Sequence, residues 1–424
     1  MPSQSPKPTR IVALADSITR NTAKIDEFYQ ANNLPSLSFD PLDTQPDLQL
    51  PAEIQRSQTA ILDATAELND LITGPRGLVS NAGYILLVKF AMSRIIHRFN
   101  LVKKVPTSGE ISYDDLATRV GINASTLRQL LRAAMTFHLF QERRPGYVSH
   151  SSVTKLLLDD PVLHDCTGFT TEDLIPAFLG VADALAMYPA ADDPSKSGYM
   201  VAHNASEPSF YLHLAKDPEK IRRFTNCMNQ ATAGPQWSLH YLTDYFPWES
   251  LGAGTVVDVG GAGGQAALAI ARKAPRLQLV VQDMADAIAA VKEEPGVNVS
   301  YMVADFFAEQ TVKGADVYLF RSVMHNWPDS QAVRILRAQI PALKAGAKVL
   351  VMDEVMPDAG AIGLSTARTQ RLMDLSMLAL GNSRVRDAEG WRELFRQADG
   401  RFEVEKIIMP DGSHLALIDV TWKP

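Results

Sequence analysis

Cysteine is rare in this sequence: Cys166 and Cys227 are the two among 424 residues. Two cysteines are too few for a disulfide framework of the kind that stabilises small secreted domains, so we expect a reducing compartment. The first residues, up to Pro8, also lack the apolar core of a signal peptide. From these absences we expect a cytoplasmic protein.

Long hydrophobic runs and an excess of positive charge are missing too. The longest apolar stretch, near residues 83–96, is interrupted by Lys89 and Arg94, so it is too short and too charged to span a bilayer. The net charge is −7, which gives no sign of a phosphate-rich partner. We therefore expect neither a membrane nor a nucleic acid as partner. The length allows two or three domains with large cores.

The most informative segment is an expected strand followed by a glycine-rich turn and a helix. Residues 255–257 favour a buried parallel strand, and small residues at 266–270 favour a helix. Asp258, Gly260 and Gly261 lie between them. In doubly wound sheets such a turn holds a nucleotide-like ligand, and glycine lets the backbone come close to it. A turn without any ligand is the alternative.

Three further apolar segments, which we expect to be strands, also end beside polar side chains. The segments and the residues that follow them are 277–282 with Asp283 and Met284, 299–303 with Asp305 and Phe306, and 316–320 with Arg321 and Met324. An acid in the place of Asp283 can hold a ribose diol through two charge-assisted hydrogen bonds. Asp305 can accept from an exocyclic amine beside the aromatic wall of Phe306.

A dinucleotide is the rival ligand for this set of strand ends. Its pyrophosphate needs a G-x-G-x-x-G turn, usually with no acid two positions ahead of it. Asp258 would repel a phosphate there, but it suits an ammonium or a sulfonium group. We therefore predict S-adenosylmethionine rather than NAD as the cofactor, and no metal. The residues predicted to bind it are Asp258, Gly260, Gly261, Asp283, Met284, Asp305, Phe306 and Arg321.

Five motifs, in order along the chain, carry a resemblance to a known family. They are Asp258-Val259-Gly260-Gly261, Gln282-Asp283-Met284, Ala304-Asp305-Phe306-Phe307, His325-Asn326-Trp327-Pro328-Asp329 and Trp391-Arg392-Glu393-Leu394-Phe395. From about residue 80 to 420 the chain resembles the fungal branch of the plant-type S-adenosylmethionine-dependent O-methyltransferases. The resemblance implies an α/β Rossmann-like methyltransferase domain preceded by an all-α dimerisation domain containing a winged helix. It also implies an obligate homodimer.

The expected organisation has four parts. They are N-terminal dimerisation helices (1–105), a winged helix-turn-helix unit (106–160), a helical connector and substrate roof (161–250), and the S-adenosylmethionine-binding Rossmann-like catalytic domain (251–424). Apolar residues at helical spacing predict helices over 10–32, 52–73 and 79–98, the second ending at the Gly74-Pro75 breaker.

The winged unit raises a DNA-binding regulator as a remote alternative. The helix expected at 124–137 carries only Arg128 and Arg132 as cations, whereas a DNA reader needs a basic face that neutralises phosphates. The resembling family carries the same module as architecture. The charge on the exposed face of this helix separates the two hypotheses.

His325 is the candidate general base, because methyl transfer to oxygen needs the hydroxyl proton removed and the pKa of histidine lies near working pH. The resemblance implies that Glu354 is the acid that orients this histidine. The family's second acid belongs to a Gly-x-Glu-Arg pattern, in which Ser383 replaces it here. The usual His-Asp-Trp reads His325-Asn326-Trp327.

Residues from several segments are expected to line a substrate pocket: Met228, Thr232, Trp237, Met324, Asp374, Met377 and Ser383. We predict an O-methyltransferase acting on a phenol or enol hydroxyl of an aromatic or polyketide-like, fungal-type secondary metabolite. The alternative is an O-methyltransferase-like pericyclase of the Diels–Alder, Alder-ene or dehydration type. In that case the bound sulfonium serves as a fixed positive charge beside a substrate carbonyl.

Overall fold

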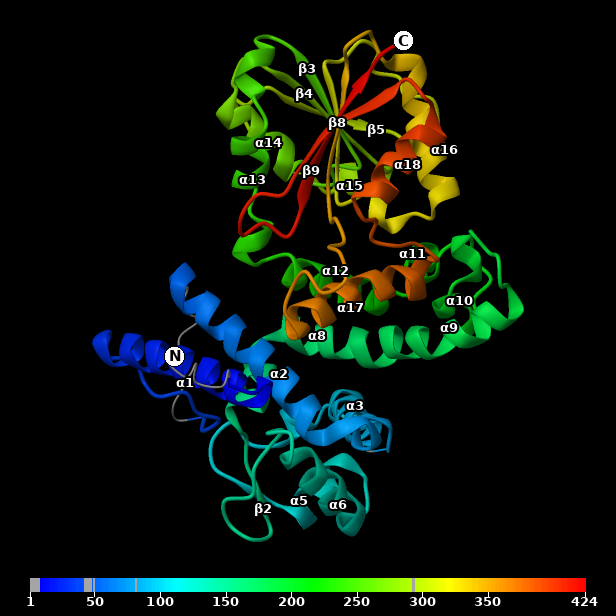
Figure 1. Ribbon diagram of the computed structural model, residues 1–424. Coiled ribbons are helices and arrows are strands. Elements are labelled where there is room, and N and C mark those ends of the chain that lie inside the picture. Colours follow the sequence, from blue (N-terminus) through cyan, green and yellow to red (C-terminus); the bar gives the residue numbers. More distant parts are fainter. Residues whose placement is uncertain (1–7, 42–47, 49, 81, 292–293) are drawn as a thin grey trace, which may run out of the picture. The chain divides into compact units, whose positions relative to one another are not determined.

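The computed structural model describes residues 8–41, 48, 50–80, 82–291 and 294–424 (Figure 1). The chain divides into two compact units. Unit 1 consists of residues 1–175, 218–228 and 359–372, and unit 2 of residues 176–217, 229–358 and 373–424. Helices α9 (Ile175–Met187), α12 (Pro218–Ala231) and α17 (Leu364–Gly381) have residues in both units.

Unit 2 is built on a seven-stranded sheet with the order β5-β4-β3-β6-β7-β9-β8 in the described residues. Its strands are β3 (Thr255–Val259), β4 (Gln278–Asp283), β5 (Val299–Val303), β6 (Val317–Arg321), β7 (Lys348–Asp353), β8 (Phe402–Ile408) and β9 (Ala416–Trp422). The first five are parallel, and β9 runs antiparallel between β7 and β8. The strand order reverses between β3 and β6, and ligands of such sheets bind at the carboxyl ends beside that point.

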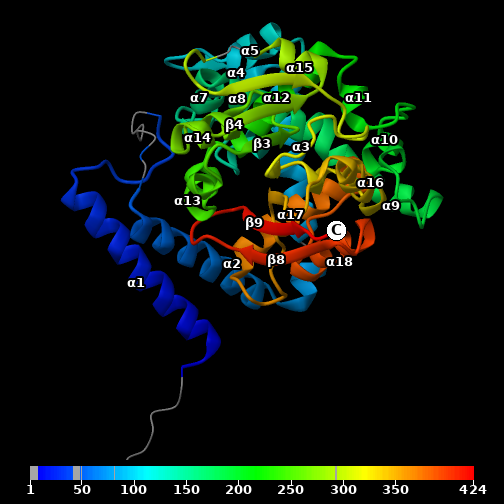
Figure 2. The same cartoon turned by 90° about the horizontal axis from the view of Figure 1, so that it is seen from above.

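Helices cover both faces of the sheet (Figure 1). They are α13 (His240–Tyr245) and α14 (Gln265–Lys273) on one face, and α16 (Asp329–Gln339) and α18 (Ala388–Ala398) on the other. Strand side chains alternate between the two layers, so Val257 and Val259 pack with the second pair and Val256 packs with the first. A parallel sheet buried on both faces requires such apolar strands. Figure 2 shows α18 beside the β8–β9 edge.

Short helical segments complete unit 2. They are η2 (Pro194–Lys196), α10 (Gly198–Ala202), α11 (Phe210–Leu214), η3 (Pro235–Trp237), η4 (Trp248–Leu251), α15 (Ala285–Ala289), η5 (Met324–Asn326) and η6 (Ile340–Ala342). Two of them, η3 and η5, carry predicted site residues.

Unit 1 is mainly helical. Its elements are α1 (Arg10–Ala31), α2 (Ala52–Ser80), α3 (Ala82–Arg98), α4 (Leu101–Lys104), β1 (Ile111–Ser112), α5 (Tyr113–Val120), α6 (Ala124–Met135), β2 (Tyr147–Val148), α7 (Ser152–Asp159), α8 (Pro161–Phe169) and η1 (Thr170–Leu174). The helical run from Ala52 breaks at Gly74-Pro75, as the sequence predicts. Gly74 adopts the non-helical φ 66°, and Pro75 then begins a second helical run within α2, a position at which its missing N–H costs nothing.

The segment from β1 to β2 forms a helix–turn–helix with a short antiparallel ladder. Ser112 and Asn123 cap α5 and α6 through their side chains, and the left-handed Gly121 ends α5. In this unit β2 pairs antiparallel with β1, and an isolated antiparallel bridge joins Gln141 to Ser149.

No single helix in the described ranges is long and apolar enough to cross a membrane. Residues 52–80 and 83–98 pass the criteria of length and composition only together, as a pair bent by 77°.

Candidate active site

The glycine turn after β3 has a conformation that requires its glycines. Gly260 has φ 73°, and a Cβ there would lie 3.0 Å from Cγ2 of Val323. A Cβ on Gly261 would lie 2.6 Å from the carboxyl carbon of Asp258. The amide of Gly260 donates to the carbonyl of Gln282 at 2.8 Å, which ties the turn to the end of β4. The turn therefore lies close over the side chain of Asp258.

Asp258 is a buried carboxylate under this turn. It is 1% exposed, and among the described residues neither of its oxygens has a hydrogen bond of acceptable geometry. Burial raises the pKa of Asp258 to about 7, against the opposing charge of Arg321. An unpaired buried carboxylate is costly, and a cationic ligand group would remove that cost. The site thus fits a ligand that carries an ammonium or a sulfonium.

Asp283 lies at the end of β4 with both oxygens oriented by backbone amides. Oδ2 accepts from the amide of Ala262 at 2.8 Å, and Oδ1 accepts from the amide of Met284 at 2.7 Å. Each oxygen keeps a further lone pair, because a carboxylate has about four acceptor sites. The side chain of Met284 is exposed beside it. The arrangement can accept hydrogen bonds from two neighbouring hydroxyl groups.

Asp305 and Phe306 follow the end of β5, where the sequence predicts an aromatic wall. Oδ1 of Asp305 accepts from the amide of Phe307 at 2.9 Å, which fixes the turn. The ring of Phe306 lies 5.8 Å from that of Trp327, and its edge would lie 3.7 Å from a Cβ on Gly260. Phe306 is thus brought to the glycine turn.

Arg321 is close enough to two acids, Asp258 and Asp353, to interact with their charges. It ends β6, and its Nη2 donates to the carbonyl of Trp237 at 3.1 Å. Burial lowers the pKa of Arg321, and the charges of Asp258 and Asp353 oppose that effect. Arg321 therefore balances the charge of both strand ends while it holds η3 in place.

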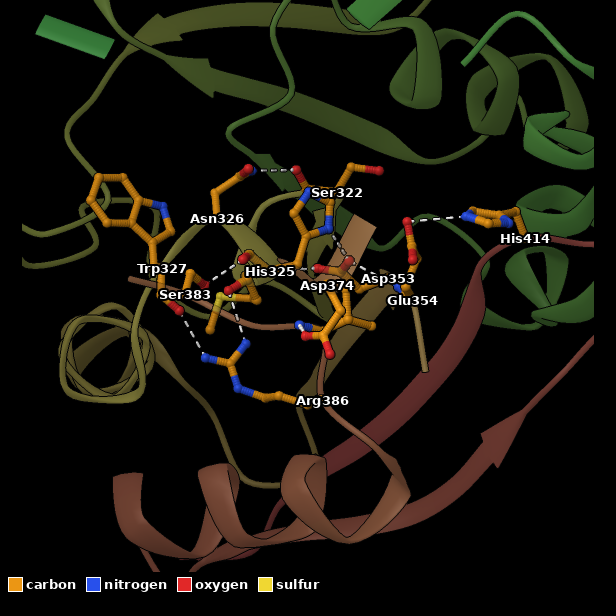
Figure 3. Close-up of polar contacts among 12 residues, drawn as sticks. Ser322, His325, Asn326, Trp327, Asp353, Glu354, Asp374, Ser383, Arg386 and His414 are labelled. Atoms are coloured by element: carbon orange, nitrogen blue, oxygen red, sulfur yellow. Dashed lines mark hydrogen bonds and ion pairs between the residues drawn. The ribbon is translucent and has the colours of Figure 1, made fainter. Parts of the chain in front are cut away.

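His325 is held by Asp353 from the end of β7 (Figure 3). Its Nδ1 forms a short hydrogen bond with Oδ1 of Asp353, and its amide donates to Oδ2 at 3.1 Å. Because a carboxylate only accepts, Nδ1 carries the proton and Nε2 keeps its lone pair. Burial alone would lower the pKa of His325, but Asp353, together with the charge of Glu354, raises it above the ordinary value. The arrangement is that of an oriented general base.

The expectation that Glu354 orients His325 is wrong. The orienting acid is Asp353, one position earlier, whose Oδ1 also accepts from the amide of Glu354 at 2.9 Å. Successive side chains of a strand point in opposite directions, so only one of two consecutive acids can face the imidazole. Oε1 of Glu354 lies 3.1 Å from Nε2 of His414 instead.

Ser383, Asp374 and Met377 act on the backbone near His325 rather than on its imidazole. The hydroxyl of Ser383 donates to the carbonyl of His325, and its amide donates to the carbonyl of Met377 at 3.1 Å. Oδ1 of Asp374 accepts from the amide of Val385 at 3.0 Å. Ser383 thus stabilises the turn that carries His325.

Arg386 is a structural residue of the site that the sequence did not reveal. Its buried guanidinium donates to the carbonyl of Met324 at 3.0 Å and to that of Trp327 at 2.8 Å, and it pairs with Asp329. Burial lowers the pKa of Arg386, and Asp329 opposes this. One side chain therefore holds both ends of η5. In the sequence, Arg386 is marked only by its place two positions after Arg384. The structure shows that Arg384 also pairs with Asp329.

Tyr211 of α11 is a second such residue. Its hydroxyl donates to Oδ1 of Asn326 at 3.0 Å, while Nδ2 of Asn326 donates to the carbonyl of Ser322 at 3.1 Å. Burial raises the pKa of Tyr211. The side chain of Asn326 is thus held by Tyr211 of α11 and by the carbonyl of Ser322.

The residues predicted to line the substrate pocket belong to both units, most of them to unit 2. Trp237 and Met324 lie in unit 2 as buried side chains, and Met324 is part of the apolar layer under the sheet. Thr232 is exposed near the end of α12 and also lies in unit 2. Met228 belongs to unit 1. Within the described ranges, no three histidine, cysteine or acidic side chains gather in a way that could hold a metal ion.

Comparisons with known proteins give a consistent result. A family model described as the O-methyltransferase domain matches residues 192–400. The sequence is 42% identical to the O-methyltransferase gsfB of Penicillium aethiopicum, over 98% of this chain and 99% of that protein.

Solved structures share the fold. OxaC in complex with SAH and oxaline is similar with a TM-score of 0.73 and 21% identity, covering 98% of this chain and 100% of that chain. A pericyclic reaction enzyme is similar with a TM-score of 0.69 and 22% identity, covering 96% of this chain and 100% of that chain.

Proposed function

This chain belongs to the O-methyltransferase family, and we propose that it transfers a methyl group from S-adenosylmethionine to a phenol or enol hydroxyl, with His325 as the general base. The acceptor is an aromatic or polyketide-like secondary metabolite. The observation that carries the proposal is the His325–Asp353 pair, at the sheet edge that also holds the glycine turn.

S-adenosylmethionine, when bound, supplies an electrophilic methyl group on a positively charged sulfur. Asp258 would attract a positive charge of the cofactor, because its pKa stays raised by burial although Arg321 offsets part of its charge. Asp283 would accept from the ribose hydroxyls, and Asp305 with Phe306 would hold the adenine. Gly260, Gly261, Met284 and Arg321 would complete the binding site.

His325 would take the hydroxyl proton at Nε2 as the substrate oxygen becomes a nucleophile. A phenol, with a pKa near that of tyrosine at about 10, gives up its proton to imidazole more readily than an aliphatic alcohol does. The imidazolium that forms is stabilised by Asp353, which keeps the ring in one orientation. This favours phenols and enols over simple alcohols.

The stoichiometry of the reaction tests the proposal. A methyltransferase forms one S-adenosylhomocysteine for each product molecule, and mass spectrometry finds the product heavier by one methyl group. Turnover with the cofactor recovered unchanged, and with an isomer or a dehydrated compound as product, would contradict methyl transfer.

The second candidate is a pericyclase that uses the bound cofactor as a fixed charge. Two observations favour it: the fold shared with a pericyclic reaction enzyme, and Ser383 in place of the family's second acid. In this case His325 would act as a hydrogen-bond donor to a carbonyl. His325→Gln should then keep part of the activity, whereas it should inactivate a methyltransferase.

We also propose a homodimer formed through the N-terminal helices of residues 1–105. Large apolar side chains of α2 and α3 are exposed in the single chain: Ile72, Val79, Tyr84, Ile85, Leu86 and Leu87. Val79, at 91% exposed, is the extreme case. Many exposed large apolar side chains on neighbouring helices favour an interface with another chain. Light scattering of the intact protein should give twice the monomer mass.

The contacts of α6 weaken the DNA-binding alternative. The guanidinium of Arg128 lies over the ring of Tyr113 at 5.1 Å, and Arg132 pairs with Glu142 at 2.9 Å. Both cations of this helix are thus engaged within unit 1, which leaves little charge for neutralising phosphates. Tight, salt-sensitive binding to duplex DNA would revive this alternative.

A further inference from the structure

The end of β7 carries two consecutive acids in very different circumstances. Asp353 accepts two hydrogen bonds from His325 and one from the amide of Glu354, so both of its oxygens are engaged. Glu354 is 4% exposed, and its Oε1 is buried without a hydrogen bond of acceptable geometry from any described residue. The Nε2 of His414 lies 3.1 Å away as an ion-pair neighbour only.

A buried carboxylate in this state has acceptor capacity to spare. It offers about four lone-pair sites, and His414 can fill one of them at most. Burying an acceptor without partners costs free energy, so buried polar groups nearly always have them. Unpartnered buried groups in an enzyme site are therefore candidates for contact with a ligand.

His414 is itself fixed in front of Glu354. Its amide donates to the carbonyl of Gln236 at 2.9 Å, and its ring lies 4.6 Å from that of Trp237. His414 belongs to the loop between β8 and β9, and β9 begins opposite the end of β7, since Ala416 pairs with Asp353. The sheet itself therefore brings His414 to Glu354.

Glu354 lies close to the proposed base. Its backbone is adjacent to Asp353, and Figure 3 shows Asp353 directed at His325 while Glu354 extends toward His414. Consecutive Cα atoms are about 3.8 Å apart, so the Asp353 and Glu354 side chains start from neighbouring points of the backbone. The charge of Glu354 also contributes to the raised pKa of His325.

We propose that Glu354 accepts a hydrogen bond from a second hydroxyl group of the acceptor substrate, and that His414 is the residue that positions this carboxylate. The inference rests on the proposed function and narrows its substrate class. The substrate is an aromatic compound with at least two hydroxyl groups. One of them faces His325 and reacts, while the other is held unmodified on Glu354.

The preference should be strong because of the charge on Glu354. Hydrogen bonds to an ionised acceptor are about twice as strong as neutral ones. A site built to bind a substrate hydroxyl discriminates strongly against the analogue that lacks it, because its own polar group is then left unpaired. An acceptor with a single hydroxyl should therefore bind much more weakly.

Calorimetry with the full-length protein saturated with S-adenosylhomocysteine tests this without turnover. The probes are 1-naphthol, 2-naphthol and the isomers of dihydroxynaphthalene. We expect the best diol to bind at least ~10-fold more tightly than either naphthol. Glu354→Gln, which keeps the shape of the side chain, should reduce this preference to under ~3-fold.

Variants of His414 test the positioning role. His414→Leu should lose most of the preference, whereas His414→Gln, which can still donate to Oε1, should restore a large part of it. The matched control is His240→Leu, because His240 is an exposed histidine of the same unit. It should keep the wild-type preference.

The outcomes separate this inference from the proposed function. Equal affinity for naphthols and all diols, no binding of any diol, or a preference that survives in Glu354→Gln would overturn the inference. The bound diol is then incubated with S-adenosylmethionine. A preference that depends on Glu354 combined with an unmethylated product would leave the inference standing and remove methyl transfer. A methylated product without the preference would support methyl transfer and overturn the inference about Glu354.

Discussion

The two halves of the active edge are held together by different means. At the ends of β3 and β4, the glycine turn and Asp283 are fixed by backbone amides from within 25 residues. At the ends of β6 and β7, His325 depends on side chains from distant segments: Asp353, Ser383, Arg386 and Tyr211. The half that we propose binds the cofactor is thus a local motif, and the half that carries the proposed base is held by tertiary contacts. Substitutions in the two halves should therefore change different properties of the protein.

The largest effect should come from replacing one of the two acids at the end of β7, Asp353. Asp353→Asn would present an amide to Nδ1 and remove the charge that orients His325, so turnover should fall by about 10²–10⁴-fold. The raised pKa of His325 depends on Asp353, so the pH at which activity rises should also move down. Glu354→Gln should lose under ~10-fold in kcat. Steady-state kinetics across pH measure both, and equal losses would mean that the two acids share the role.

The next largest effect should be on stability at Arg386. Arg386→Met leaves the carbonyls of Met324 and Trp327 without their donor, and should cost about 2–4 kcal/mol. Arg384 pairs with the same acid, Asp329, but its side chain is 62% exposed, so Arg384→Met should cost under ~1 kcal/mol. Chemical denaturation compares them. Similar losses would show that the turn is not held by the buried cation.

Cofactor affinity should respond to the local half alone. Asp283→Ala removes a carboxylate that can accept from two hydroxyl groups, so S-adenosylmethionine should bind roughly 10–100-fold more weakly. His325→Ala should change this affinity by less than ~3-fold, because the two sites are held independently. Calorimetry measures both variants. A comparable loss in His325→Ala would contradict the division into two halves.

Cofactor affinity should also fall in mild acid. The pKa of Asp258 is about 7 in the free protein, so the carboxylate becomes neutral below that pH and no longer attracts a cation. Affinity should decrease by up to ~10-fold for each pH unit below 7. Asp258→Asn should bind weakly at every pH, with a flat profile. A wild-type profile that is equally flat would remove Asp258 from the binding site.

The smallest effect should be at Tyr211. Tyr211→Phe loses the hydrogen bond to Asn326, worth about 1 kcal/mol, so kcat should fall roughly fivefold while cofactor affinity stays the same. Tyr245→Phe, at an exposed tyrosine, is the control and should be silent. An unchanged kcat in Tyr211→Phe would show that α11 does not support the catalytic turn.

The same contrast explains what the sequence could predict. The family resemblance and the Rossmann-like fold are confirmed, because strands, glycines and strand-end acids are local patterns. The orienting acid was misplaced by one residue, since motif matching does not fix which of two neighbours faces the imidazole. Arg386 and Tyr211 were missed because the partners of Arg386 lie 57 to 62 positions away and the partner of Tyr211 lies 115 positions away. The four-part domain division and the cofactor contacts stay predictions.

The reversed strand β9 has a consequence for how such an enzyme can change. It begins opposite the end of β7, so the connection from β8, residues 409–415, arrives beside the chemistry while both of its ends are anchored in the sheet. Hairpin connections accept insertions and exchanges readily, whereas buried strands do not. New acceptor molecules can therefore be explored by remodelling this one loop, in evolution or in the laboratory, while the His325–Asp353 pair and the glycine turn are kept.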